Sequence, residues 1–212
     1  MRLKIEFFEA STLTVAKRLL GKRLVRQLPE GRVAGWVVEV EAYLWRLDPA
    51  CHANRGMTAS NQAMFGPPGT LYVYPIHAKY CMNVVTEQEG RGAAVLIRAL
   101  EPCDGHEILA KYRSGVDQKQ LTNGPGKLCM AMNIDRRLNG IDLTTHPDIW
   151  LESDPNPKKG RWTIRRSGRI GISSATEKLW RFFIDGNRFV SGTSKDHSKS
   201  PIQSLSRTES DF

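Results

Sequence analysis

The sequence lacks any long apolar run. No window of its 212 residues approaches the ~18 consecutive apolar residues of a membrane-spanning helix. The start, Met1-Arg2-Leu3-Lys4, is charged and has no apolar segment of the kind that directs secretion. We therefore expect an intracellular protein without a membrane partner, located in the cytoplasm or nucleoid of a bacterium or in the nucleus of a eukaryote.

Cysteine is also scarce. Cys51, Cys81, Cys103 and Cys129 lie far apart, and no C-x-x-C pair is present. This spacing argues against a zinc knuckle and against a disulfide framework, and it favours buried free thiols. The pair Cys51-His52 suggests a metal ligand or a nucleophilic thiol, but no second ligand pair is visible. We predict neither a metal nor another cofactor.

Acidic residues are too few to balance the basic ones. The chain has 31 Lys and Arg against 22 Asp and Glu, a net charge of +9 and a sequence pI near 9.6. Residues 193–212 hold three basic and three acidic groups, so the whole excess belongs to residues 1–192. A basic folded domain is a candidate for a polyanionic partner such as nucleic acid, although many basic proteins bind none.

The pattern of apolar and turn-forming residues predicts one α+β domain, residues 1–192, with a mostly antiparallel curved sheet and peripheral helices. No internal repeat is apparent. The expected strands cover residues 22–28, 32–44, 71–74 (stopped by Pro75), 81–86, 93–100, 149–152, 169–173, 180–184 and 188–191.

Three helices are expected between and beside these strands. One begins at Ser11 or Thr12 and stops at Gly21, one opens with a capping box at residues 104–107, and one runs from Pro125 to about residue 133. The irregular stretch 45–69 is long enough to predict a binding loop. Residues 193–212 are Ser-rich and aperiodic, which predicts a disordered tail.

The strand around Val37–Leu44 carries two acids on one face. Residues i, i+2 and i+4 of a strand share a face, so Glu39, Glu41 and Tyr43 lie on the same side. Two carboxylates whose Cα atoms are ~6.6 Å apart repel each other in a poorly hydrated cleft unless cations oppose them. The alternative is an edge strand whose carboxylates simply face water.

Other strands supply polar groups that could complete a site. Arg98 follows an apolar run, Tyr72 and Tyr74 share a strand face, and Asn83 lies on the next strand. An approach of Arg98 to Glu41 would favour the ionised carboxylate, which could then hold a water molecule as general base. Ordinary core packing is the alternative for the tyrosines.

Several segments in order carry a family resemblance. They are Glu39-Val40-Glu41-Ala42-Tyr43-Leu44 followed by His52, Gly69-Thr70-Leu71-Tyr72-Val73-Tyr74, Cys81-Met82-Asn83, Val95-Leu96-Ile97-Arg98-Ala99-Leu100-Glu101-Pro102, and Asn123-Gly124-Pro125-Gly126-Lys127-Leu128. Together with the segments that end near Ser191, they resemble the alkyladenine (3-methyladenine) DNA glycosylase family.

The resemblance implies a monofunctional DNA glycosylase, with residues 1–192 as its glycosylase domain. Such an enzyme flips a damaged purine out of double-stranded DNA and hydrolyses the N-glycosidic bond, which starts base excision repair. The implied substrates are 3-methyladenine, 7-methylguanine, hypoxanthine and ethenoadenine. The resemblance also implies a monomer without a cofactor.

The resemblance implies roles for individual residues. Glu41 would activate water as the general base, and Arg98 would hold that water and the carboxylate. Tyr43 would stack on one face of the flipped base, and His52 and Tyr74 on the other. Glu39 receives no such role and is expected to be structural.

Further roles concern specificity and the DNA around the lesion. Asn83 would lie at the pocket floor and hinder the amino group of guanine, and backbone groups around His52 would exclude adenine. The chain departs from the family where a tyrosine can serve as wedge: His77 stands there, and Ile76 is the other candidate. Lys127 and Lys79 are candidate phosphate contacts.

Two other functional classes stay open at this point. One is a non-catalytic nucleic-acid-binding module of the same fold, in which Glu41 is only structural. The other is a transferase or RNA-processing domain. The cluster Arg165, Arg166 and Arg169 is interpreted as a solvated basic surface.

Overall fold

The computed structural model describes residues 1–153, 162–192 and 203–205. Over these ranges the strands form one antiparallel sheet in the order β3-β4-β5-β2-β8-β7-β9, and β1 pairs with both β2 and β6. The strands are β1 Arg23–Leu28, β2 Gly31–Tyr43, β3 Leu71–Ile76, β4 Lys79–Thr86, β5 Ala93–Asp104, β6 Ile149–Glu152, β7 Ile164–Ser167, β8 Arg181–Ile184 and β9 Gln203–Leu205. The predicted α+β class with a curved antiparallel sheet is confirmed.

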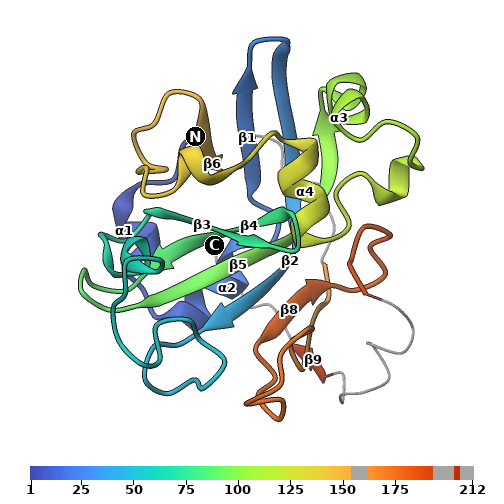
Figure 1. Cartoon of the computed structure of the whole chain (residues 1–212). Helices are drawn as coiled ribbons and strands as arrows, with labels where there is room; N and C mark the ends of the chain where they lie inside the picture. The colour runs from blue at the N-terminus through green and yellow to red at the C-terminus, as the bar shows by residue number, and fades with distance from the viewer. Residues whose placement is uncertain (154–161, 193–202, 206–212) are drawn as a thin grey trace.

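Strand β2 lies inside the sheet and carries both acids. Its first half forms a hairpin with β1, residues 39–41 pair with β8, and β5 pairs along its other side. The register with β5 shifts between Val37 and Val40. Such irregularities, or β-bulges, are common next to functional sites. Figure 1 shows β2 passing between β5 and β8. The edge-strand alternative is therefore wrong.

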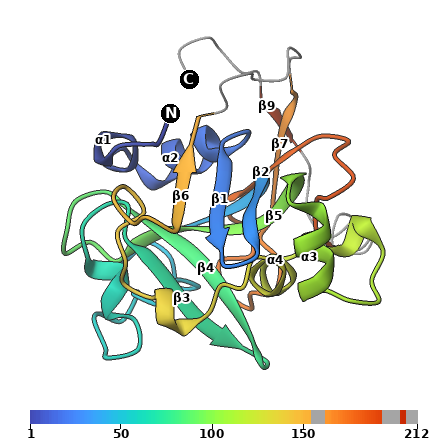
Figure 2. The same cartoon turned by 90° about the horizontal axis from the view of Figure 1, so that it is seen from above.

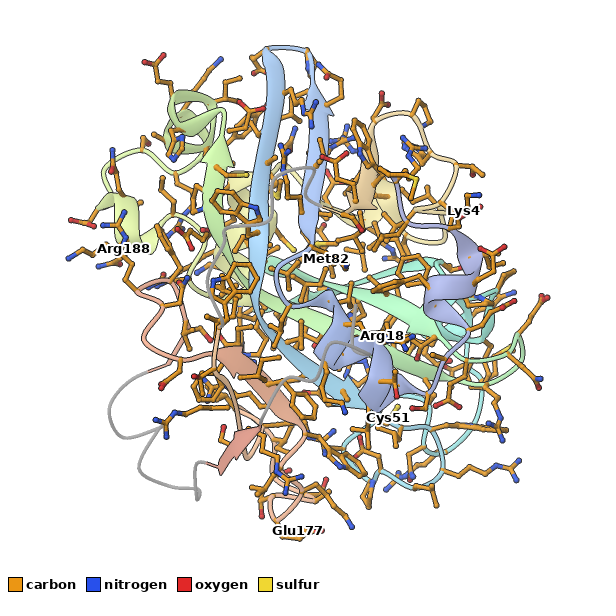
Figure 3. All side chains as sticks on the ribbon, turned by 180° about the vertical axis from the view of Figure 1, so that it is seen from behind. Lys4, Arg18, Cys51, Met82, Glu177 and Arg188 are labelled. Atoms are coloured by element: carbon orange, nitrogen blue, oxygen red, sulfur yellow. The ribbon has the colours of Figure 1, made fainter. Side chains whose placement is uncertain are left out.

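The helices are short and lie on the periphery. They are α1 Ile5–Phe8, α2 Thr12–Leu19, α3 His106–Tyr112 and α4 Pro125–Ala131, with 3-10 turns η1 Gln62–Phe65, η2 Gln118–Gln120 and η3 Arg136–Leu138. Figure 2 shows α1 and α2 on one side of the molecule and α3 and α4 on the other. From behind, α2, on which Arg18 is labelled, crosses β2, against which it packs (Figure 3). None of the helices in the described ranges combines the length and the apolar character needed to cross a membrane.

Two apolar clusters hold this arrangement. The larger one joins α2, the strands and α4, and includes Met82, which is labelled at the centre of Figure 3. The smaller one lies under the loop 45–69 and comprises Cys51, Ala53, Met64, Phe65, Tyr72, Val85 and Ala94. Gly92 supports this loop, because a Cβ there would lie 2.3 Å from the Cβ of Ala53. The long loop is thus anchored by its own core.

Several element boundaries differ from the sequence expectations. Strand β3 does not stop at Pro75 but continues to Ile76, because a proline is tolerated on this outer strand. The capping box at Asp104 does not form, because β5 extends to this residue and pairs it with Ala34. Helix α3 begins instead after Gly105 in the left-handed region.

Neither residues 169–173 nor residues 188–191 form a strand. The Ile170 amide donates to a side chain of β2 instead of to a neighbouring strand, and Gly171 has a φ of 80°. In the second segment Asn187 accepts the amide of Phe189, which produces a turn. On the side away from β2, β8 pairs with β7, which precedes both segments.

Within the segment 193–212, expected to be disordered, Gln203–Leu205 forms β9 and pairs with β7. The rest of that segment lies outside the described residues.

Candidate active site

A cavity of about 500 Å³ opens beside the end of β2. Its walls come from Tyr43, from the loop around His52, from the hairpin β3–β4, and from the segment 170–174. Leu96, Arg98 and Pro125 complete the lining. The volume lies within the range of small-ligand pockets, and the walls mix aromatic rings with a few polar groups.

Glu41 lies directly behind this lining. Its carboxylate is fully buried, and its partners all line the cavity: the Tyr43 hydroxyl donates to Oε2 over 2.9 Å, the Ile170 amide donates to Oε1 over 2.7 Å, and Arg98 Nη1 lies 3.2 Å from Oε1. The structure therefore brings Arg98 to Glu41.

Glu39 has a separate set of partners. Arg181 Nε donates to its Oε1 over 2.6 Å, Arg98 Nε over 3.0 Å, and the Ser191 amide donates to Oε2 over 2.6 Å. Burial alone would raise the pKa of Glu39, but the charges of Arg98 and Arg181 hold it below its usual range. Glu39 thus fixes the guanidinium that also contacts Glu41.

The guanidinium of Arg98 forms ion pairs with both Glu39 and Glu41. Burial would lower the pKa of Arg98, but the charges of Glu41 and Glu39 raise it above its ordinary value. Arg181, fully buried, also donates to the Ser167 hydroxyl and to the Ser191 carbonyl. Charged groups without water are stable only when they are paired and hydrogen-bonded in this way.

Aromatic rings face the cavity from β2, from β3 and from the loop that carries His52. The rings of His52 and Tyr74 are 4.5 Å apart, those of Tyr72 and Tyr74 stack at 5.5 Å, and His52 Nδ1 lies 3.0 Å from the Tyr72 hydroxyl. Burial raises the pKa of Tyr72 to about 12. Burial also raises the pKa of Tyr43, and the charge of Glu41 raises it further. Both phenols therefore stay neutral at ordinary pH, and the Tyr43 hydroxyl donates to Glu41.

His52 is exposed on one side and flanked by the tyrosines on the other. This partial removal of water lowers the pKa of its imidazole. The side chain of Asn61 donates from Nδ2 to the His52 carbonyl over 2.9 Å, and its Oδ1 accepts the amide of Thr58 over 2.6 Å. The backbone next to the cavity is held by this buried amide.

Asn83 lines the cavity from β4. Its Nδ2 donates to the Tyr72 carbonyl over 3.2 Å, and the residue is buried. Because Nδ2 is engaged, the orientation of the amide within the cavity is fixed.

The hairpin β3–β4 ends beside the cavity mouth. Ile76 lines the cavity and is 41% exposed, whereas His77 is exposed outside the lining. His77 and Ala78 have φ values of 43° and 54°, the pattern of a two-residue turn that matches strand twist. The tip is therefore a tight turn with one apolar side chain at the opening.

The start of α4 lies against this hairpin. A Cβ on Gly126 would lie 3.0 Å from the Lys79 side chain, and Lys127 Nζ donates to Asn123 over 2.9 Å. Burial lowers the pKa of Lys127, and the charges of Arg113 and Lys79 add to this effect. These three basic side chains form a cationic group near the cavity mouth.

The sequence interpretation missed one pair of residues. Arg169 is not part of a solvated cluster: it is buried, forms a bidentate ion pair with the buried Asp48, and its Cζ lies 4.6 Å from the centre of the Tyr43 ring. No local pattern links the two residues, which are 121 positions apart. The one signal in the sequence was that Asp48 lies in the stretch 45–69, which is predicted to be a binding loop.

Comparisons with known proteins match most of this chain. The family described as Methylpurine-DNA glycosylase (MPG) matches residues 6–188. Proteins named "Putative 3-methyladenine DNA glycosylase" are similar over most of the chain: that of Rhodopirellula baltica is 45% identical over 96% of this chain and 88% of its own length, and that of Methanocella arvoryzae is 48% identical over 88% and 94%. A family match of this extent, on a chain whose paired acids lie behind an aromatic cavity, shows that the protein belongs to the methylpurine-DNA glycosylases, hydrolytic enzymes of DNA repair.

Proposed function

We propose that this enzyme uses a water molecule activated by Glu41 to release damaged purines flipped out of duplex DNA. The observation that supports this most directly is a buried carboxylate whose three partners all line one aromatic cavity. Among the contacts of the described residues, Oε2 accepts one hydrogen bond, from Tyr43, and so keeps a lone pair for water.

Two effects of the carboxylate combine in the reaction. Glu41 removes a proton from water as it attacks the anomeric carbon, and its negative charge stabilises the oxocarbenium-like transition state. Arg98 orients the carboxylate, and Tyr43 holds its second oxygen. The bond between base and sugar breaks, the water oxygen joins the sugar, and the base leaves with its electron pair.

The rings account for recognition of the base. Tyr43 stacks on one face of the flipped purine, and His52 with Tyr74 on the other. Base–aromatic stacking contributes ~1–3 kcal/mol per base, which is comparable to the cost of extruding it. Alkylated purines are electron-poor and gain further from the negative faces of the rings.

Polar groups in the same cavity select against normal bases. The fixed amide of Asn83 hinders the extra amino group of guanine, and backbone groups around His52 exclude the amino group of adenine. This selection is consistent with 3-methyladenine, 7-methylguanine, hypoxanthine and ethenoadenine as substrates. Rejection matters as much as affinity because normal bases are in vast excess.

The surroundings of the cavity suit duplex DNA. We assign Ile76 as the wedge that fills the gap left by the base, with His77 beside it at the turn, because an apolar side chain at the opening can replace the lost stacking. Lys79 and Lys127 contact phosphates on either side of the lesion. We propose that the enzyme acts as a monomer.

The substitution Glu41→Gln tests the proposal. We expect release of hypoxanthine from a defined duplex to fall by at least about 100-fold, because a neutral amide can neither take the proton nor stabilise the cation. Binding to the lesion duplex should persist. Glu89→Gln, on an exposed loop, is the matched control and should behave as wild type.

Release at a normal rate by a folded Glu41→Gln variant would contradict the role of Glu41. A wild-type protein that binds the lesion but releases no base would instead favour a non-catalytic module. Equal activity on RNA and DNA would point to an RNA-processing enzyme.

A further inference from the structure

Behind the Tyr43 ring lies a charged pair that the proposed chemistry does not use. Arg169 has its Cζ 4.6 Å from the centre of the Tyr43 ring and 5.2 Å from that of Trp180. Tyr43 lines the cavity and Arg169 does not. The guanidinium is therefore enclosed between two rings, with Tyr43 separating it from the cavity.

Asp48 neutralises this guanidinium. Both oxygens of the carboxylate accept from Arg169, one of them over 2.7 Å, and both side chains are fully buried. The carboxylate also accepts the backbone amides of Leu44 and Ala50, and Arg169 also donates to the Ala42 carbonyl over 2.9 Å. The pair connects the loop 45–69 to the segment that follows β7.

A charge at this position acts on whatever stacks on Tyr43. A cation on one face of an aromatic ring opposes a second cation on the other face, since both draw on the same negative charge of the ring. A unit charge about 8 Å from a base in a partly buried site changes an equilibrium constant on the order of tenfold. The lesions differ in this respect: 7-methylguanine in DNA is cationic, whereas hypoxanthine is neutral.

We propose that Asp48 is a specificity-determining residue: by neutralising Arg169 behind the Tyr43 ring, it allows the cavity to accept cationic alkylated purines as readily as neutral ones. The inference rests on the proposed stacking of the base on Tyr43. It assigns a role to a charge that does not itself touch the base.

The experiment measures kcat/KM for 7-methylguanine and for hypoxanthine in the same duplex context, after subtraction of spontaneous base loss. In Asp48→Asn the uncompensated guanidinium should lower the ratio of 7-methylguanine to hypoxanthine release on the order of tenfold. In Arg169→Gln the uncompensated carboxylate should raise the ratio by a similar factor. The double variant Asp48→Asn/Arg169→Gln should return the ratio to the wild-type value.

Opposite shifts separate a charge effect from a loss of structure. A misplaced Tyr43 ring would reduce release of both bases and move the ratio in the same direction in both single variants. Asp48→Asn leaves a buried cation without its charged partner, so we expect it to melt at the lowest temperature. Arg169→Gln keeps the carboxylate bonded to the amides of Leu44 and Ala50, and it carries the test alone if Asp48→Asn does not fold. Thermal melting of each variant establishes which of them are folded.

Asp135→Asn is the matched control. Asp135 forms the same kind of bidentate pair with Arg137, but the Arg137 side chain is 81% exposed on η3. The control should leave the ratio unchanged. An unchanged ratio in Arg169→Gln, or shifts of the same sign in both single variants, would overturn the inference while leaving the proposed function intact. A wild-type protein that releases neither base would instead mean that the proposed function has failed.

Discussion

Single side chains in this site owe their properties to neighbours far away in the chain. Glu39 and Glu41 are two positions apart on β2, yet Glu39 contacts two guanidinium groups and Glu41 contacts groups that line the cavity. The sequence could suggest Arg98 as a partner of Glu41, because an arginine after an apolar strand needs a counter-charge. It could not suggest Arg181 or Arg169, since their partners lie 142 and 121 positions away.

The pH dependence of His52 is a prediction at this scale. Partial removal of water lowers its pKa below the ordinary value of 6.5 in the folded protein. The unfolded chain therefore binds the proton more readily, so the stability that His52 contributes is fully present above pH 6.5 and declines as the pH falls below it. We expect an imidazole titration midpoint below 6.5 by NMR, with the resonance assigned through its loss in His52→Asn.

The stability difference between wild type and His52→Asn should shrink on acidification, measured by denaturant unfolding at a series of pH values. A midpoint above 6.5 would contradict the lowered pKa. It would indicate that a carboxylate stabilises the imidazolium.

Elements of regular structure were predictable where their pattern was local. The hairpin of β1 and β2, strands β4 and β5 and the start of α4 follow from apolar alternation, turn residues and a first-turn proline. The strands expected at 169–173 and 188–191 failed because their amides serve side chains of β2: the amides of Ile170 and Ser191 donate to Glu41 and Glu39. Tertiary hydrogen bonds to buried acids override the strand propensity there.

The hairpin tip gives a prediction at the scale of elements. Ile76→Ala removes the apolar side chain at the cavity mouth and should reduce kcat/KM on duplex substrate about tenfold, because the gap in the stack is no longer filled. Release from single-stranded substrate should change little. His77→Asn keeps a residue suited to positive φ and serves as the comparison.

Equal losses on duplex and single-stranded substrates would contradict a wedge function for Ile76. A larger duplex-specific loss in His77→Asn would transfer that function to the imidazole.

The whole molecule combines a net charge of +9 with a cavity whose mouth lies near a cationic group. Each phosphate that a lysine neutralises releases counterions. The logarithm of the binding constant therefore falls linearly with the logarithm of the salt concentration. Composition alone could indicate a polyanionic partner. It could not indicate which basic residues face DNA, because that depends on how α4 and the hairpin β3–β4 come together.

Salt dependence is the corresponding prediction. Lys79→Gln and Lys127→Gln should each reduce the slope of log K against log salt by about one, with similar losses on lesion and undamaged duplexes. Fluorescence anisotropy with a labelled duplex measures this. Lys4→Gln, at an exposed position beside α1 (Figure 3), should leave the slope unchanged, and an equal change there would mean that only total charge matters.

The separate apolar core beneath the loop 45–69 has a consequence for redesign. Glu41 and Arg98, which we propose act on the sugar, are fixed by neighbouring strands. The loop 45–69, which supplies part of the wall proposed to meet the base, packs on Phe65 and Ala53 against Gly92. We expect that exchanging the loop 45–69 together with this apolar cluster would alter the size of the base admitted, while Glu41 and Arg98 keep their positions on the strands. In contrast, a single substitution that enlarges the cavity at Met64 or Tyr72 would also remove packing from this cluster, because both residues belong to it.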